Sequence, residues 1–154
     1  GQGIDALHKE VKQQTNPHIR NVPVFCNDVD GFVFVVTDGT MRHIPNPNVF
    51  MALFNQPMDT TRMAHFSTAP SAATVPPHPF GVPIPEFAHL ITFQGEYYLV
   101  DTSPNGQQVR RHIAHGQRNN FGFVMAGNVK MIDAQQFQSL WQGTPLMEPT
   151  FASH

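Results

Sequence analysis

The chain has little charge and no long apolar run. Of its 154 residues only 13% are charged, about half of the usual share, and nine Lys and Arg stand against eleven Asp and Glu. Binding to nucleic acid without sequence preference needs a dense basic face, so this balance speaks against nucleic acid as a partner. No apolar segment approaches the roughly 20 residues of a membrane-crossing helix, and we expect no membrane span.

Cysteine and catalytic signature motifs are also scarce. The single cysteine, Cys26, excludes an intramolecular disulfide, and its neighbours in VPVFCN favour a small buried side chain. A catalytic thiol at this position would need a base placed beside it. The sequence contains no H-E-x-x-H, no C-x-x-C, no phosphate-binding glycine loop and no G-x-S-x-G elbow. We therefore expect no cofactor and lean against an enzyme.

The chain has the length of one ordinary domain, and amides and hydroxyls take the place of the missing charge. A domain of this size buries roughly 70% of the surface of its unfolded chain, so it needs neither disulfides nor a metal to hold a core. A solvated but weakly charged surface suits sugars, other protein surfaces or assembly contacts. We expect one domain, residues 1–154.

Two segments share a scheme of three short strands separated by turns. The first, from Val22 to Ile44, alternates β-branched and aromatic runs with the turn sequences NDVDG and TDGT. The second, from Ala88 to Ile113, does the same around QG and SPNG. The expected strands lie at 22–26, 32–36 and 40–44 in the first segment, and end at Phe93, Asp101 and Ile113 in the second.

An alignment of the two segments indicates an internal duplication. When Gly31 is placed on Gly95, one insertion in the turn brings Arg42-His43-Ile44 onto Arg111-His112-Ile113. A further hairpin is expected around Gly127-Asn128. The fold we predict is mainly β, of the α+β class, with two duplicated antiparallel meander units.

Each unit also carries a signal for a short capped helix. Asn46 is a good N-cap before Pro47, and Asp133 with Gln136 forms a capping box. Both caps are followed by Phe-x-x-Leu, and we expect these side chains in the core and the two helices in equivalent roles. The core and stop residues are Phe50, Leu53, Asn55 and Pro57 in the first copy, and Phe137, Leu140, Gly143 and Pro145 in the second.

The two units are flanked and joined by segments of other kinds. Ile4, Leu7 and Val11 form one apolar helical stripe, which predicts an N-terminal helix or a mobile arm. Five prolines between residues 69 and 85 exclude a helix or a central strand, so we expect an extended strap that brings Phe80 and Phe87 to the core. The expected parts are 1–16 (helix or arm), 21–57 (first unit), 67–87 (strap) and 88–146 (second unit).

Candidate binding residues are few. Tyr97 and Trp141 offer aromatic surface for a sugar ring, and Arg110 with Arg111 forms a small basic cluster for a phosphate or carboxylate. No catalytic residue is indicated, and we expect no metal site. The alternative is a small histidine-dependent hydrolase, with or without a metal; in its metal-dependent form His43, His112 and His115 would converge.

The stretch FVFVVTDGTMRHIPNPNVFMALF resembles short hairpin-plus-helix repeats of the pattern YLVxxGxxRxIPxxxxFxxL. The matching residues are Gly39, Arg42, Ile44, Pro45, Phe50 and Leu53, and in the second unit Tyr98, Leu99, Val100, Arg111 and Ile113. In the second unit IAHG replaces the Ile-Pro of the pattern. Such repeats occur in extracellular bacterial wall-associated modules and in actinophage tail proteins.

The resemblance implies a noncatalytic binding or structural module, extracellular or on a virion. Its partner would be a glycan, a cell-surface polymer or a neighbouring protein subunit, including a second copy of the chain. A phage virion or tail structural protein is the first alternative, and the small hydrolase is the alternative from another class.

Overall fold

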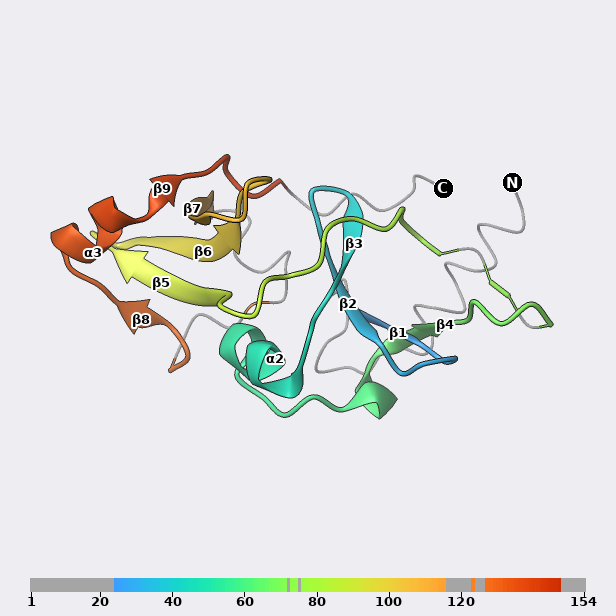
Figure 1. Ribbon diagram of the computed structural model, residues 1–154. Coiled ribbons are helices and arrows are strands. Elements are labelled where there is room, and N and C mark those ends of the chain that lie inside the picture. The colour runs from blue at the N-terminus through green and yellow to red at the C-terminus, as the bar shows by residue number, and fades with distance from the viewer. Residues whose placement is uncertain (1–23, 72, 75, 116–122, 124–126, 148–154) are drawn as a thin grey trace.

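The computed structural model describes residues 24–71, 73–74, 76–115, 123 and 127–147. Within these residues the chain is an α+β protein that is mainly β, with two mixed sheets and two short helices (Figure 1). This confirms the expected fold class. The expected N-terminal helix, residues 1–16, lies outside the described residues.

The first sheet has the strand order β3-β2-β1-β4, and the second has the order β8-β5-β6-β7-β9. In both, three strands form an antiparallel meander, as the turn chemistry predicts. The first-sheet strands are β1 (Val24–Asn27), β2 (Val33–Thr37), β3 (Thr40–His43) and β4 (Ala64–Phe66). The second-sheet strands are β5 (His89–Phe93), β6 (Glu96–Thr102), β7 (Gln108–Ile113), β8 (Lys130–Met131) and β9 (Trp141–Gln142).

The two meanders agree in register as well as in order. In the first sheet Arg42 lies opposite Val35, and in the second Arg111 lies opposite Leu99. The neighbouring pairs agree too, since His43 faces Phe34 and His112 faces Tyr98. The residues that the alignment matched therefore occupy the same positions in their sheets.

The outer strands follow the same plan. β4 runs parallel to β1, and β8 runs parallel to β5. The strand that follows the turn at Gly127-Asn128 is β8, which pairs with β5, and the first arm of the hairpin expected there lies largely outside the described residues. The preceding residues, 124–126, lie outside the described part.

Each meander is flanked at its far edge by an extended strap with the sequence G-x-P-(I/L). Gly81 donates its N–H to Met41 O at 3.0 Å, and Gly143 donates to Arg110 O at 3.0 Å. Three residues on, Ile84 donates to His43 O and Leu146 to His112 O. A Cβ at Gly81 would clash with Thr40, and one at Gly143 would lie 3.0 Å from Val109 Cγ2, so glycine permits this close approach at both places.

The strap differs in one respect from the expectation. Ile84 is its buried anchor, whereas Phe80 is 51% exposed and Phe87 is only partly buried. Ile84 lies in the cluster between the sheets, whereas the Phe80 ring lies against Phe34 and Phe66 on the other face of the first sheet.

One hydrophobic cluster contains side chains of both sheets. Four pairs of positions that match in register lie in it, and all eight side chains are buried. The pairs are Val24 and Leu90, Val35 and Leu99, Ile44 and Ile113, and Ile84 and Leu146. A second cluster, around Phe25, Phe34 and Phe66, covers the opposite face of the first sheet.

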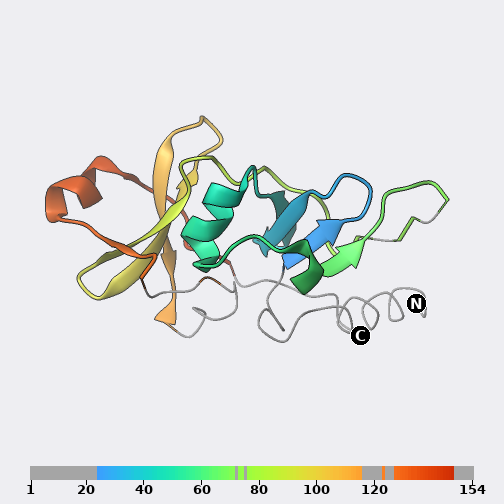
Figure 2. The ribbon, with the colours of Figure 1, turned by 90° about the horizontal axis from the view of Figure 1, so that it is seen from below.

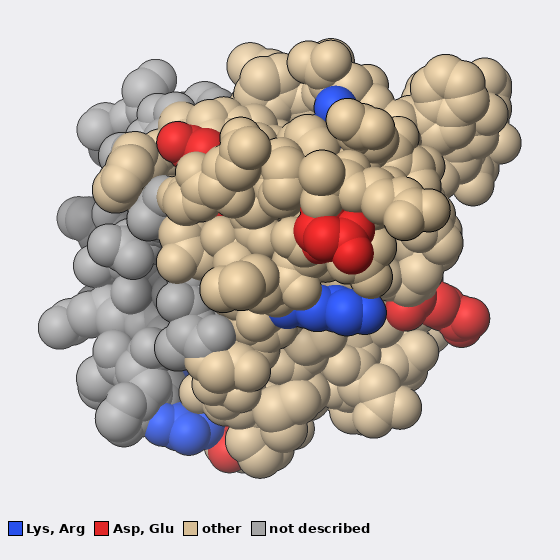
Figure 3. Space-filling view, turned by 90° about the vertical axis from the view of Figure 1, so that its left-hand side faces the viewer, with Lys and Arg blue, Asp and Glu red and all other residues tan. Residues whose placement is uncertain are grey.

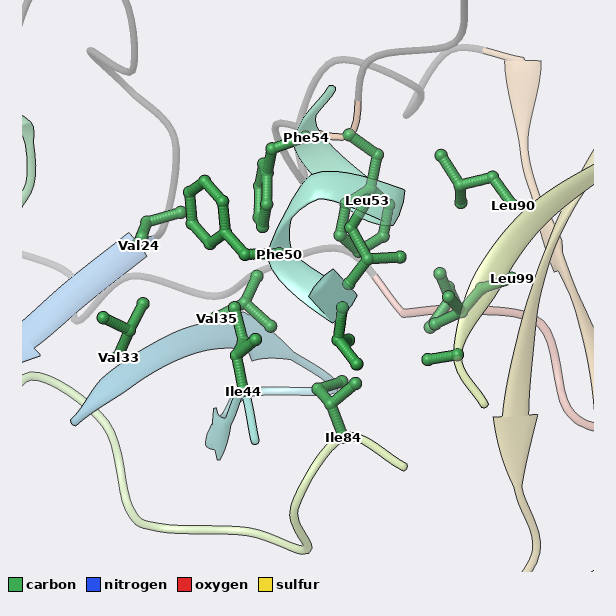
Figure 4. Close-up of a cluster of buried hydrophobic side chains, with 14 of the residues drawn as sticks. Val24, Val33, Val35, Ile44, Phe50, Leu53, Phe54, Ile84, Leu90 and Leu99 are labelled. Atoms are coloured by element: carbon green, nitrogen blue, oxygen red, sulfur yellow. The ribbon is translucent and has the colours of Figure 1, made fainter. Parts of the chain in front are cut away.

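Helix α2 (Pro47–Phe54) fills the space between the two sheets (Figures 1 and 2). It begins as predicted, because Asn46 accepts a hydrogen bond from Val49 N and Pro47 takes the first helical position. It ends at Asn55, which adopts the left-handed conformation with φ of 53°. Figure 4 shows Phe50 on the side of Val24 and Leu53 on the side of Leu90 and Leu99.

Helix α3 (Ala134–Ser139) has the predicted capping box of Asp133 and Gln136, but it is not the counterpart of α2. It lies at the far end of the second sheet and buries none of its residues (Figure 1). It joins β8 to β9, whereas α2 precedes β4. It ends before Leu140, not at Gly143, because Trp141 and Gln142 leave the helix to pair with β7.

These different positions predict unequal costs of truncation. Phe50→Ala should lower the free energy of unfolding by about 3–5 kcal/mol, the usual loss for a buried phenylalanine. Phe137→Ala should lower it by about 1–2 kcal/mol, since this half-buried ring stacks on Phe93 at 4.3 Å but borders solvent. Urea unfolding of both variants tests the difference, and equal losses would contradict the fold assigned to α3.

Candidate functional site

The most distinctive polar feature of the molecule is a buried ion pair between the two sheets. Arg42 in β3 donates to both carboxylate oxygens of Asp101 in β6, at 2.7 and 2.8 Å. The side chains are 3% and 1% exposed. The remaining N–H groups of Arg42 donate to Thr37 Oγ1, Val82 O and Pro83 O. All five guanidinium N–H groups thus have partners within the chain.

Arg111 in β7 makes the matching contacts from the other sheet. It donates to both carboxylate oxygens of Asp38, at 2.8 and 2.7 Å, and to Asp101 at 3.1 Å. Its Nε donates to Thr144 O in the second strap, as Nε of Arg42 does to Val82 O in the first. Each arginine therefore binds a carboxylate of the opposite unit and a carbonyl of its own strap.

The turn between β2 and β3 places Asp38 for this contact. Asp38 and Gly39 both have positive φ, 57° and 75°, as a two-residue hairpin turn requires. Burial alone would raise the pKa of Asp38, but the hydrogen bonds and charge of Arg111 outweigh it and lower this pKa. The balance is the same at Asp101, where burial is outweighed chiefly by Arg42 and the pKa is again lowered.

The network joins the Arg-His-Ile segments of both units around carboxylates of the chain itself. The guanidinium of Arg111, one of the predicted ligand-binding residues, donates all of its N–H groups within the chain. Since no N–H is left for an external anion, we assign this network to the connection between the sheets and not to ligand binding.

Arg110 lies on the opposite face of β7, against α3. Its guanidinium donates to Phe137 O and Leu140 O, which are carbonyls at the C-terminal end of that helix, and lies 4.0 Å from the Phe137 ring centroid. A cation here complements the helix dipole and adds hydrogen bonds to carbonyls at the end of the helix. The adjacent arginines thus point to opposite faces and do not form one basic cluster.

The three histidines of the metal hypothesis are not gathered. His43 stacks on Phe32 at 4.4 Å, and burial lowers its pKa, while His112 contacts Glu96 Oε2 at 2.8 Å. His115 is exposed at the end of β7. In the part of the chain that the structure describes, no three His, Cys, Asp or Glu side chains are grouped so that they could hold a metal ion.

The two predicted aromatic residues lie apart along the second sheet. Tyr97 is half-buried and pairs in register with Ile113, whereas Trp141 in β9 pairs with Val109 and is 62% exposed. These positions are four residues apart along β7, a distance of about 13 Å, so the two rings do not form one platform. Gln142, which follows Trp141 in β9, and Gln108, which precedes Val109 in β7, are both exposed.

The end of the molecule that carries α3, β8 and β9 has few charged side chains. Lys and Arg lie beside Asp and Glu there, and most of the surface carries no charge (Figure 3). Within the described residues, no helix has the length and hydrophobicity to cross a bilayer. A comparison of the chain with models of known protein families and with curated proteins finds no match.

Sequence reasoning missed the two carboxylates and the second strap. Asp38, in the TDGT turn, and Asp101, at the end of a strand, carry no local signal of their partners, because these come from the other unit. One local signal was present: GVPIPE, residues 81–86, and GTPLME, residues 143–148, share glycine, proline, an aliphatic residue and glutamate at equal spacing. Each follows an Arg-His-Ile segment and supplies the carbonyls that bind its arginine.

Removal of the Asp101 carboxylate, which contacts both arginines, should destabilise the fold. Asp101→Asn should lower the free energy of unfolding at neutral pH by about 3–5 kcal/mol, because it leaves Arg42 buried without its counter-charge. Asp38→Asn should cost less than half as much, since Asp38 is 27% exposed. Chemical denaturation measures both, and a larger loss at Asp38 would contradict the central role of Asp101.

The lowered pKa values of Asp38 and Asp101 predict how the stability of the fold changes at acid pH. A pKa that is lower in the folded state stabilises the fold above the unfolded value of about 3.9, and the stabilisation is lost as the pH falls through the lower folded value. The free energy of unfolding should therefore decline from pH 5 towards pH 2, and less steeply in Asp101→Asn. The exposed Asp30→Asn serves as control and should keep the wild-type slope.

Proposed function

We propose that the chain is a noncatalytic binding or structural module, acting outside the cytoplasm at a cell surface, on a glycan or within a larger assembly. The observation that carries this proposal is the placement of Trp141. Its large ring is mostly exposed, and it lies on an edge strand that is hydrogen-bonded to the sheet and not on a loose loop.

The surroundings of Trp141 support a neutral polymer as the partner. The exposed residues Gln108 and Gln142 adjoin Val109 and Trp141 along their strands, and amides can donate and accept hydrogen bonds to hydroxyl groups. An aromatic face covers the apolar side of a sugar ring, while the weak charge of this end of the molecule offers little to a polyanion (Figure 3). A cell-wall or cell-surface glycan fits this combination.

The similarity of the two sheets leads to a proposal about how the fold arose. We infer that the two meander units arose by duplication of one unit that comprised three strands, a parallel outer strand and a G-x-P-(I/L) strap. The matching registers and the reciprocal arginine contacts support this inference. By this alignment α3 is an addition of the second unit.

A virion or tail structural protein is the second candidate, and exposed apolar side chains favour it. Met131 in β8 is 81% exposed, at the opposite edge of the same sheet from Trp141. Large exposed hydrophobic side chains on sheet edges are typical of surfaces that pair with other subunits. In this case the partner would be another virion protein or a second copy of the chain.

A binding assay with matched variants separates the two candidates. Trp141→Ala should reduce retention on purified cell walls or on a glycan array at least tenfold, because it removes the ring that would stack on the sugar. Met131→Ala removes a similarly exposed apolar group from the other edge and should bind like wild type. If no polymer retains the wild-type chain, the glycan proposal is wrong.

Light scattering addresses the assembly candidate with the same variants. A defined oligomer of the wild-type chain that dissociates in Met131→Ala would favour the structural role. A strict monomer at high concentration would count against self-assembly.

A further inference from the structure

His65 in β4 has both ring nitrogens against oxygen atoms that accept hydrogen bonds. Nδ1 lies 2.7 Å from Asp28 Oδ1, and Nε2 lies 2.7 Å from Thr60 O. A carbonyl oxygen can only accept, and so can an ionised carboxylate, whereas a neutral imidazole has a single N–H to donate. Both bonds therefore form together only when the ring carries two protons.

The elements around His65 favour a cation. The β1–β2 turn carries Asp28 and Asp30, and Asp59 caps the short helix η1 (Thr60–Arg62). On the same elements, Arg62 in η1 carries a positive charge. Cys26 is the neighbour of His65 in β1, and burial raises the pKa of its thiol, so it stays neutral. Among the described residues, three carboxylates thus stand against one guanidinium.

We propose that His65 is a pH-sensitive clamp, which as an imidazolium cation ties the outer strand β4 to the β1–β2 turn and to η1. The ring holds three segments that are separate in sequence: β4 itself, Asp28 across the sheet, and Thr60 in the preceding helical turn. β4 is only three residues long and lies at the edge of the first sheet, so few other backbone bonds hold it.

Loss of one ring proton releases one side of this clamp. The carboxylate of Asp28 retains the remaining proton at Nδ1, because a charged acceptor makes the stronger hydrogen bond. The lone pair of Nε2 then faces the carbonyl oxygen of Thr60, and η1 is released. The clamp therefore opens as the pH rises, with η1 moving before the turn.

His112 provides a comparison within the same chain. It also contacts a carboxylate, Glu96 Oε2, through Nε2 at 2.8 Å. Among the described residues no second acceptor faces its Nδ1, so a single proton satisfies this histidine. The two contacts of His65, by contrast, need two ring protons.

Long-range ¹H–¹⁵N NMR of the full chain at pH 7 tests the protonation state, with His65→Gln to assign the signals. Both nitrogens of His65 should show the shifts of protonated nitrogens. In Asp28→Asn, which keeps an acceptor but removes the charge, one nitrogen should become unprotonated, and Glu96→Gln should leave His65 unchanged. One unprotonated nitrogen in the wild-type ring would overturn the proposal.

Hydrogen exchange tests the clamp itself. In wild type the amides of residues 60–66 should be at least threefold less protected at alkaline pH than at pH 7. In Asp28→Asn a neutral ring can donate Nε2–H to Thr60 O and accept at Nδ1 from the introduced amide, so this loss of protection should be absent, whereas Asp30→Asn should behave like wild type. Asp28 is exposed, so the variant is expected to fold, and its melting temperature verifies this. Equal protection of the wild-type amides at both pH values would show that the ring does not hold η1.

Discussion

The rest of the structure depends on the ion pair of Arg42 and Asp101. Removing a carboxylate and a guanidinium from water costs several kcal/mol per ion, and the cost is met only when the geometry and the remaining hydrogen bonds are good. Here the pair is bidentate, and Thr37 and two strap carbonyls take the other N–H groups of Arg42. The pair therefore fixes the first strap, β3 and β6 relative to one another. A shift of either sheet would leave a buried charge without its partner, which is how an ion pair of modest net stability specifies one arrangement.

The apolar core follows from this arrangement. The arginines hold the two meanders through equivalent positions, and the aliphatic residues that match in register lie in one cluster, with α2 between the sheets (Figure 4). Arg42, Arg111, Asp38 and Asp101 are thus occupied inside the molecule, as connections between its halves. What the second sheet presents to a partner is of another kind: exposed aromatic and sulfur-containing side chains among amides.

Local signals in the sequence correctly predicted the features that depend on neighbouring residues. Turn residues such as Asp38-Gly39 and β-branched runs located both meanders, and the caps at Asn46 and Asp133 located the starts of both helices. The role of each helix could not be predicted in the same way, because Phe-x-x-Leu describes a helix with an apolar side and not the surface that receives it. The connection in which each helix lies decides this: α2 enters the space between the sheets, and α3 crosses the outer face from β8 to β9. The ion pairs were missed for a similar reason, since their members are 59 and 73 residues apart and belong to different units.

The candidate site is linked to this scaffold through the second strap. Gly143 lies so close to Val109 and Arg111 that a Cβ would be 3.0 Å from Val109 Cγ2, and the carbonyl of Thr144 binds Arg111. The strap is therefore held by the same arginine that binds Asp38 across the two sheets, and Trp141, in β9, is two residues before its first residue, Gly143. An aromatic ring on a segment fixed in this way loses little conformational freedom when a ligand stacks on it, so more of the contact energy remains as affinity. The buried charges thus have an indirect part in the proposed binding: they make an exposed tryptophan a rigid surface.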